Sequence, residues 1–259
     1  MNKKIGAFFL FSLLITTSVN AQNSINPWSI KVPNFKFKQT YIQQNQSNTL
    51  YIGEEQNNNN FLHIEILNKL HFNDLNQIER VISEPNIVFE YNGINSSPDN
   101  SKFKELTLLI DNNQKIIESK GDSLLLNYLN QIQFFDLTSL SPILKLKSQK
   151  HIGDQWLDSN FTPNLGVANL KLLNISENKA KIEVEVELNM LQEVQAGELI
   201  QFNYIGSLKG FIIVNTDFAN LISQSDFKIQ LEGRTIYSET KIEIPSTIKG
   251  SFSNALEIL

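Results

Sequence analysis

Apolar and polar residues alternate without interruption along the segment 180–188. The apolar members are Ala180, Ile182, Val184, Val186 and Leu188, and Lys181, Glu183, Glu185 and Glu187 lie between them. Successive side chains of a strand point to opposite faces, so the pattern predicts a strand with one buried and one solvated face. A register shift of one residue would turn three glutamates into the core, which fixes the register. Ordering the backbone costs roughly 1–2 kcal/mol per residue, about what burial of the apolar side chains supplies, so the strand requires a surrounding sheet.

Strand patterns continue through the second half of the chain. Leu170 to Ile175 and the segment 180–188 flank the turn-forming residues Ser176 to Lys179, which predicts a hairpin. Gly206 and Gly210 lie within strand-like sequence and favour a bulge or bend. Further strands are predicted at Phe202 to Ile205, Phe211 to Val214, Phe227 to Leu231 and Thr240 to Ile244, with turns at Asn215 to Ala219 and Gly233-Arg234, and with Pro245 ending the last firm strand.

The first half of the chain is less regular. The Asn- and Gln-rich segments 43–48 and 56–60 are interpreted as solvated loops flanking a short apolar piece, 50–52. Leu75, Ile78 and Ile82 have helical spacing and follow Asp74, a capping residue, and Pro85 would end that helix. Strands are predicted over Trp28 to Tyr41, with Pro33-Asn34 switching the phase, over Phe61 to Leu67 and Ile87 to Tyr91, and in a hairpin from Leu106 to Ser119.

One clear amphipathic helix is predicted in the middle of the chain. Gly121-Asp122 provides its start and cap, and apolar residues then recur at three- and four-residue spacing. These residues are Leu125, Tyr128, Leu129, Ile132 and Phe135, and Pro142 closes the region. The predicted fold class is therefore mainly β (α+β): a large curved antiparallel sheet or half-barrel meander with one amphipathic helix packed on it.

The N-terminus has the pattern of a secretory signal peptide. Lys3 and Lys4 precede a short apolar run, and small residues lie at a cleavage position after Ala21. We expect residues 1–21 to be removed and residues 22–259 to form a single β-rich domain. The apolar run is too short to span a membrane, so the mature chain is expected to be exported and not membrane-spanning, in the periplasm rather than outside the cell.

Net charge and cysteine content limit the expected binding partners and the sources of stability. The formal net charge is −5 at pH 7, so nucleic acid is excluded as an expected partner, because phosphate binding needs a basic face. The chain has no cysteine, so no disulfide supports the fold and its stability must come from the core.

Residue types that carry chemistry are present without a diagnostic arrangement. His63 and Glu65 form a His-x-Glu pair, but a zinc site needs three or four ligands, and the other histidines are His71 and His151. The better interpretation is that both are ordinary surface side chains without a metal. No Gly-x-Ser-x-Gly nucleophile motif is present, and the Ser-x-x-Lys matches at 176–179 and 225–228 are short enough to arise by chance.

Carboxylates allow two further interpretations. Asp154 and Asp158 beside Trp156 would be the pair to test for glycoside hydrolysis. The favoured interpretation is structural, with Asp154 capping a turn at Gly153 and Trp156 packing on the sheet. The glutamates of the segment 180–188 are either a cation-binding stripe or a solvated face paired with lysines of the next strand. We therefore predict no catalytic, cofactor-binding or metal-binding residues, no cofactor and no enzymatic activity.

The element Gly153-Asp154-Gln155-Trp156, together with the signal peptide, the hairpin at 106–119 and the long charged strands, resembles a family of secreted Bacteroidota proteins of unknown function. The resemblance covers roughly residues 28–248 and implies fold and export, without an activity. By architecture alone, the predicted sheet and helix are distantly similar to periplasmic lipoprotein carriers, in which a curved antiparallel sheet and a helix enclose an apolar cavity.

These patterns lead to two functional hypotheses. The first is a non-catalytic periplasmic binding or carrier-like module that holds an apolar small molecule or lipid between the sheet and the helix 124–135. The alternative is a structural or interaction protein of the cell envelope, which meets an envelope protein through sheet edges or the acidic face. A third interpretation, an outer-membrane barrel, suits the alternating strands but not the mid-chain helix.

Overall fold

The computed structural model describes residues 24–26, 34–51, 53–72, 77–111, 116–131, 144, 146–159, 161, 166–196, 198–217 and 220–259. The expected signal peptide at 1–21, the predicted strand at 28–33 and the end of the predicted helix at 132–135 lie outside these residues.

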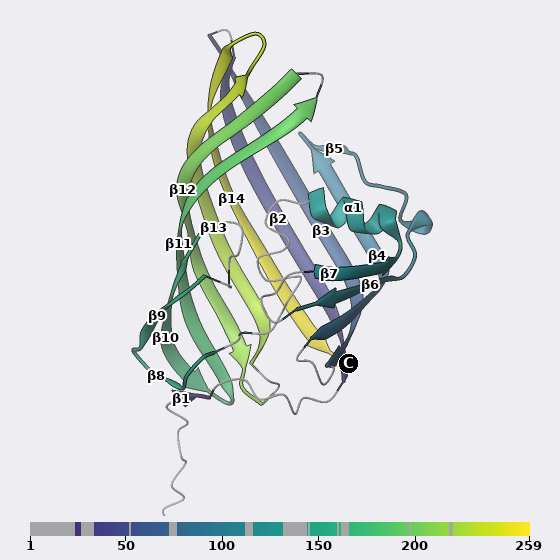
Figure 1. The fold of residues 1–259 in the computed structure, drawn as a ribbon, viewed down its shortest axis with the longest axis vertical. Coiled ribbons are helices and arrows are strands. Elements are labelled where there is room, and N and C mark those ends of the chain that lie inside the picture. Colours follow the sequence, from purple (N-terminus) through teal and green to yellow (C-terminus); the bar gives the residue numbers. More distant parts are fainter. Residues whose placement is uncertain are drawn as a thin grey trace, which may run out of the picture.

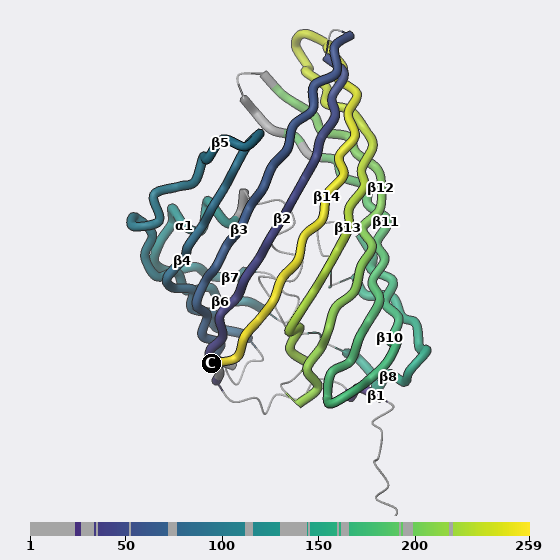
Figure 2. The backbone as a smooth tube through the Cα atoms, turned by 180° about the vertical axis from the view of Figure 1, so that it is seen from behind, coloured from purple at the N-terminus to yellow at the C-terminus, as the bar shows by residue number. Residues whose placement is uncertain are grey.

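Most of the described residues belong to one 12-stranded antiparallel sheet (Figures 1 and 2). Its strands are β2 (Phe35–Tyr51), β3 (Glu54–Phe72), β4 (Ile78–Tyr91), β5 (Ile94–Asn95), β6 (Leu106–Ile110), β7 (Ile116–Gly121), β9 (Gln155–Asp158), β10 (Ala168–Ser176), β11 (Lys179–Ala196), β12 (Glu198–Asn215), β13 (Leu221–Tyr237) and β14 (Ile242–Ile258). They follow the order β7-β6-β4-β3-β2-β14-β13-β12-β11-β10-β9, with β5 beside β4. A separate ribbon pairs β1 (Ser24–Ile25) with β8 (Lys150–His151). The predicted fold class is confirmed.

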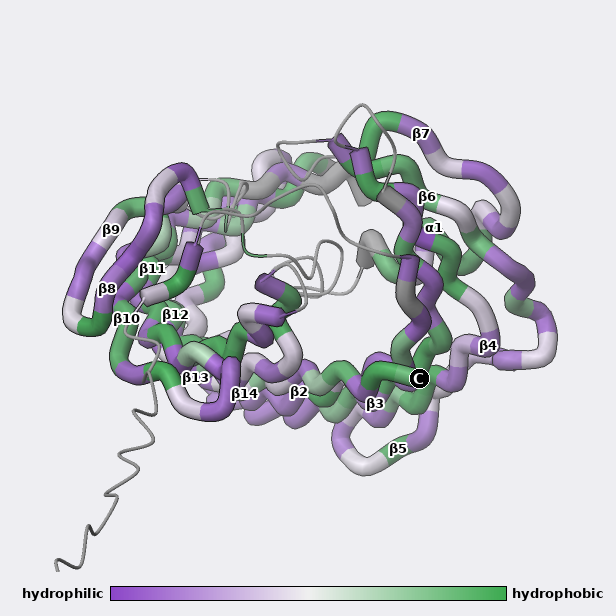
Figure 3. Tube along the Cα trace, turned by 90° about the horizontal axis from the view of Figure 1, so that it is seen from below, coloured by the Kyte–Doolittle hydropathy of each residue, from purple (hydrophilic) through white to green (hydrophobic). Residues whose placement is uncertain are grey.

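The sheet is curved and open. Figure 3 shows that β9–β11 and β4–β7 lie on opposite sides of the molecule, connected through β12, β13, β14, β2 and β3. The strands β7 and β9 are its two edges, so the sheet does not close on itself. We call the end with the hairpin tips near residues 51–54, 196–198 and 237–242 the far end, which is at the top of Figure 1, and the opposite end the core end.

The alternation at 180–188 is confirmed within β11. Ala180, Ile182, Val184 and Val186 are fully buried, while the three glutamates between them are exposed. We call the buried side the inner face of the sheet and the opposite side the outer face. Directly paired residues share a face, so the register extends this assignment from strand to strand.

Both predicted hairpins form. The strands β10 and β11 are joined at Glu177 and Asn178, which both have positive φ, 49° and 61°. Two successive left-handed residues are typical of the tight turns whose twist matches a hairpin. The strands β6 and β7 pair over residues 106–121, as the pattern predicted.

The Asn- and Gln-rich segments are not loops. Segments 43–48 and 56–60 pair with each other in β2 and β3, where Asn45 lies opposite Asn60 and Asn48 opposite Asn57. The turn between the strands lies near Gly53, whose φ is 80°. The loop interpretation was wrong because a ladder is held by backbone hydrogen bonds, so polar side chains can extend a hairpin beyond the apolar core.

The predicted helix around residues 74–82 is wrong over 78–82, and residues 74–76 lie outside the described residues. Ile78, Arg80 and Ile82 alternate inward along β4, and the spacing of the two isoleucines fits a strand as well as a helix. Pro85 does not end the element, because it lies in a β-bulge. Glu84 and Pro85 together oppose a single residue of β3, and Glu84 has φ of 51°. A bulge is one of the few sheet positions that tolerate proline.

Two further predictions, of a turn and of a strand end, were wrong. Gly233-Arg234 is not a turn but part of β13, and Pro245 lies inside β14, opposite Arg234. The ladder between β14 and β2 begins one residue later, at Ser246 opposite Thr49, so Pro245 occupies a position with a neighbour on one side only.

Gly206 and Gly210 lie in the unbroken strand β12, with no register shift at either glycine. A Cβ at Gly210 would lie 2.0 Å from the carbonyl oxygen of Asp226 and 2.7 Å from the ring of Phe227. Glycine is therefore required there by the close approach of β13 rather than by a bulge.

The helix α1 (Ser123–Gln131) begins at the cap that the sequence predicted. The Asp122 carboxylate accepts hydrogen bonds from the backbone N–H groups of Leu124 (2.8 Å) and Leu125 (3.0 Å), and its second oxygen accepts from Lys104 N (2.6 Å). Leu125 and Leu129 are buried in the core, so the apolar stripe of the helix faces inward as expected.

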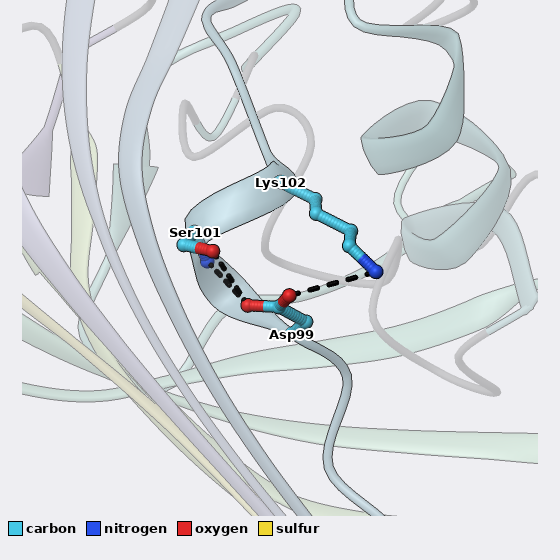
Figure 4. A network of polar contacts seen from close by, with 3 residues as sticks. All are labelled: Asp99, Ser101 and Lys102. Atoms are coloured by element: carbon cyan, nitrogen blue, oxygen red, sulfur yellow. Dashed lines mark hydrogen bonds and ion pairs between the residues drawn. The ribbon is translucent and has the colours of Figure 1, made fainter.

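The loop before β6 covers the part of β4 that β6 does not reach. Ile87 N donates to Asn100 Oδ1 at 2.9 Å, and Phe89 N donates to Ser97 Oγ at 3.0 Å. The turn η1 (Asn100–Lys102) is capped by Asp99, which accepts from Ser101 N at 3.2 Å and Ser101 Oγ at 2.6 Å and lies 3.5 Å from Lys102 Nζ (Figure 4). The hydrogen bonds from Ser101 lower the pKa of Asp99.

Candidate functional site on the inner face

The inner face changes character along its strands. Toward the core end its apolar side chains are buried in one continuous cluster. Toward the far end, Met190, Phe202 and Ile248 belong to the same apolar surface but are only partly buried. Phe202 and Met190 lie on neighbouring strands, and Ile248 lies on β14 opposite the buried Leu231. The apolar inner face therefore extends beyond the fully covered core.

Tyr204 lies on the inner face of β12, two residues from Phe202. It is directly opposite Gly233 in the register, and its ring packs where a side chain at Gly233 would lie. Its hydroxyl is 2.5 Å from Ser246 Oγ and 3.2 Å from Thr235 Oγ1. An aromatic ring held at one end by hydrogen bonds leaves a rigid apolar surface.

A polar cluster interrupts the apolar inner face toward the core end. It consists of Arg80 on β4, Asn68 on β3, Gln39 on β2 and Asn254 on β14, each at most 1% exposed. Arg80 donates from Nε to Asn68 Oδ1 at 2.8 Å and from Nη2 to Gln39 Oε1 at 2.6 Å. Gln39 Nε2 then donates to Asn254 Oδ1 at 2.8 Å. Burial lowers the pKa of Arg80 to about 9, so the guanidinium stays charged at neutral pH.

The polar cluster contains the functional candidates that the sequence patterns missed. Arg80 was placed in the wrong type of element, because the spacing of Ile78 and Ile82 was interpreted as helical. Read with a period of two, the same residues put Arg80 on the buried side between them. Asn254 carries no comparable signal, because its burial depends on the neighbouring strands β13 and β2.

The His63–Glu65 pair lies on the outer face. Glu65 binds Lys38 Nζ at 2.8 Å, and its hydrogen bond with Lys38 lowers the pKa of the carboxyl group. His71 instead lies 2.6 Å from Asn34 Oδ1, and His151 is exposed beside β8. Within the described residues, no three His, Cys, Asp or Glu side chains gather as a metal site.

The Gly153–Trp156 element has the structural role that the sequence favoured. Gly153 has φ of 93°, and the carboxylate of Asp154 accepts a hydrogen bond from His151 N at 2.8 Å. Trp156 is partly buried against the core, opposite Leu170, with Lys150 Nζ 5.4 Å from its ring centre.

The remaining sequence candidates do not assemble a site. Ser225 is buried on the inner face while Lys228 is exposed on the outer face, so this Ser-x-x-Lys match cannot form a pair. Ser176 and Lys179 flank the turn between β10 and β11. Glu185 forms an ion pair with Lys209 on the neighbouring strand, which is the cross-strand pairing expected for a solvated acidic face.

Two hollows of about 380 Å³ each lie over the outer face. The residues that line the first hollow are all polar, and those that line the second are both polar and apolar. The first is lined by Gln46, Ser47, Asn48, Asn57, Asn58, Asn59, Thr247 and Lys249. The second is lined by Ile42, Gln44, Lys209, Gly210, Phe211, Asp226, Phe227, Lys228, Ser251, Phe252 and Ser253.

No described helix combines the length and apolar character needed to cross a bilayer. No protein-family model and no curated protein matches the chain, so its resemblance to secreted Bacteroidota proteins stays a prediction.

Among solved structures, the chain is similar to a chain of lipovitellin from a study of lipid–protein interactions in that protein, with a TM-score of 0.52 and 10% identity. The match covers 89% of this chain and 26% of the lipovitellin chain, so this chain spans about a quarter of its length. At this identity the likeness shows the fold alone, in agreement with the large curved antiparallel sheet that the sequence predicted.

Proposed function

We propose that the protein is a non-catalytic, exported binding or carrier-like module that holds an apolar ligand on the inner face of its sheet. The observation that carries this proposal is the extension of the apolar inner face beyond the buried core, where Met190, Phe202 and Ile248 remain partly exposed. Water contact with such a concave apolar surface is unfavourable, and an apolar ligand would relieve it.

The fold likeness supports the same function. The similar lipovitellin chain comes from a protein whose lipid interactions were studied, and the similarity covers 89% of this chain. A fold alone does not determine function, so the proposal depends on the inner face itself. We also propose that the protein is located in the periplasm and has no catalytic activity.

Binding can be measured with N-phenyl-1-naphthylamine, a neutral apolar dye that fluoresces on leaving water. We expect saturable fluorescence enhancement with the purified protein. Phe202→Asp places a carboxylate on the partly exposed inner surface and removes an aromatic contact, so the affinity should fall about 10-fold or more.

Ile205→Asp is the matched control. Ile205 lies on the same strand three residues away, but on the outer face and 66% exposed. It should leave the dye affinity within about twofold, because surface substitutions change little. Absence of saturable binding in the wild type, or equal losses in the two variants, would contradict the proposal.

A second candidate function, contact with an envelope protein, is favoured by one observation. The short edge strand β9 carries Leu157, which is 74% exposed, and Val167, just before the neighbouring strand β10, is 51% exposed. An exposed apolar sheet edge can pair with another chain. Purification with a bound protein and without lipid, lost on Leu157→Lys, would favour this function over the carrier.

A further inference from the structure

We infer that the polar cluster on the inner face recognises the carboxylate headgroup of an amphiphilic ligand, and that Asn254 Nδ2 is the donor that contacts it. This inference rests on the proposed function, because the same inner face would hold the apolar tail. It adds the chemical class of the ligand: a long-chain carboxylic acid rather than a neutral apolar molecule.

The orientation of Asn254 follows from the hydrogen bonds of its neighbours. An arginine has only donors, so Gln39 must turn its oxygen toward Arg80, which lies 2.6 Å away. The amide nitrogen of Gln39 therefore faces Asn254, and Asn254 must present its oxygen in return, at 2.8 Å. The Nδ2 group of Asn254 is consequently the donor at the end of a chain that begins at a guanidinium.

Among the residues that the structure describes, that donor has no hydrogen-bond partner. Asn254 is 1% exposed, and its Nδ2 is shielded from water. A buried donor without an acceptor is costly and rare in folded proteins, so such a group calls for an acceptor. Hydrogen-bonded chains polarise one another, and the charge of Arg80 makes this N–H group a stronger donor for an anion than for a neutral group.

The surroundings of Asn254 suit the head of an amphiphile. Tyr41 and Phe252 border it on the inner face, and further along β14 the inner positions are Gly250 and Ile248. Ile248 is six residues from Asn254, roughly 20 Å along an extended strand. A ligand with its carboxylate at Asn254 would thus extend its tail over Phe252 along β14, in the direction of the partly exposed Ile248. Because Asn254 is buried, the headgroup reaches it by displacing side chains that pack over it.

The test compares two ligands of equal chain length, dodecanoate and dodecanol, whose direct binding is measured by isothermal titration calorimetry at pH 8, where the acid is ionised. A merely apolar site prefers the alcohol, because desolvating a carboxylate is costly. We expect the wild type to bind dodecanoate roughly 10-fold or more tightly than dodecanol, in the range of one hydrogen bond to a charged group.

Asn254→Asp keeps the acceptor for Gln39 and replaces the unpartnered donor by an anionic oxygen, so it should abolish the preference for the acid while dye affinity is retained. Asn60→Asp is the control: it adds the same charge on the inner face two strands from β14, opposite Asn45 and roughly 13 Å along β3 from Ile64, and should keep the preference. Should Asn254→Asp lose the dye, Asn254→Ala removes the amide donor and acceptor without adding charge and should likewise lose the preference.

Equal affinities for acid and alcohol in the wild type, as expected if an internal water satisfies Asn254, would overturn the inference. So would a preference that survives in the Asn254 variants. In either case, retained dye binding would leave the proposed function intact, whereas a wild type that binds no dye would refute the proposed function itself.

Discussion

Val184→Asp tests the division between inner and outer faces at the strand where the alternation is clearest. Val184 is fully buried on β11, between the exposed residues Glu183 and Glu185. The substitution loses the burial of an apolar side chain, worth about 1.5–3 kcal/mol. It also places a carboxyl group in the core, where the group is more stable protonated than charged.

The cost of that protonation can be worked out. Holding a carboxyl of ordinary pKa near 3.9 protonated at pH 7 costs about 4 kcal/mol, at 1.36 kcal/mol per pH unit. The free energy of unfolding should therefore fall by about 5–7 kcal/mol at pH 7, comparable with the total stability of many proteins, about 5–15 kcal/mol.

The pH dependence has a definite sign. The introduced carboxyl has a raised pKa in the folded state, so its electrostatic penalty grows with pH above the unfolded pKa and disappears as the pH falls toward about 4. Relative to the wild type, the deficit should shrink there to the burial loss alone.

Urea unfolding followed by circular dichroism at pH 7 and pH 4 measures both values. Glu185→Val is the control on the outer face. It removes an exposed ion pair with Lys209 and should change stability by less than about 1 kcal/mol. A Val184→Asp protein with nearly wild-type stability at pH 7, or a deficit that does not vary with pH, would refute the assignment of faces.

The other predictions are also read by urea unfolding. Asp122→Ala removes the cap of α1 and should cost about 0.5–2 kcal/mol. Burial raises the pKa of Asp122, but backbone hydrogen bonds from Lys104, Leu125 and Leu124 leave it lowered overall. The cap's contribution to stability is therefore present above about pH 4 and is lost as the pH falls through the folded pKa. An equal effect of the substitution at pH 3 and pH 7 would contradict this. Tyr204→Phe should cost about 0.5–1.5 kcal/mol, and Ser246→Ala should then add little, because the two hydroxyls share one hydrogen bond; fully additive costs would argue against that bond. Glu84→Gly should stabilise by up to about 1 kcal/mol by relieving a left-handed conformation, and a loss would show that Glu84 is not strained.

Strand alternation predicted the second half of the fold well. From β10 to β11 the apolar residues face a core on one side only, so a period of two is visible in the sequence. The turn at Glu177-Asn178 was recognisable from its turn-forming neighbours Ser176 and Asn178, and asparagine tolerates positive φ.

The errors in the first half share a physical cause. Residues 43–48 and 56–60 form a ladder beyond the apolar core, so their pairing leaves no hydrophobic pattern in the sequence. Pro85, Pro245 and Gly233 were taken as ends or turns, but a bulge, a one-sided position and a close aromatic neighbour accommodate them within strands. Such accommodation depends on partners distant in sequence.

The candidate site was only half predictable. Composition and alternation indicated an apolar inner surface, which the partly buried residues such as Phe202 confirm. The polar cluster joins Gln39, Asn68, Arg80 and Asn254 from four strands, with Gln39 and Asn254 separated by 215 positions. No local pattern shows that these side chains meet.

Native mass spectrometry of the freshly purified protein tests the central claim most directly. If the inner face holds an apolar ligand, the spectrum should show the chain with a bound small molecule that organic extraction removes, and Phe202→Asp should reduce its occupancy while Ile205→Asp does not. A wild-type chain that carries nothing, and that takes up no dodecanoate when this is added, would contradict the claim.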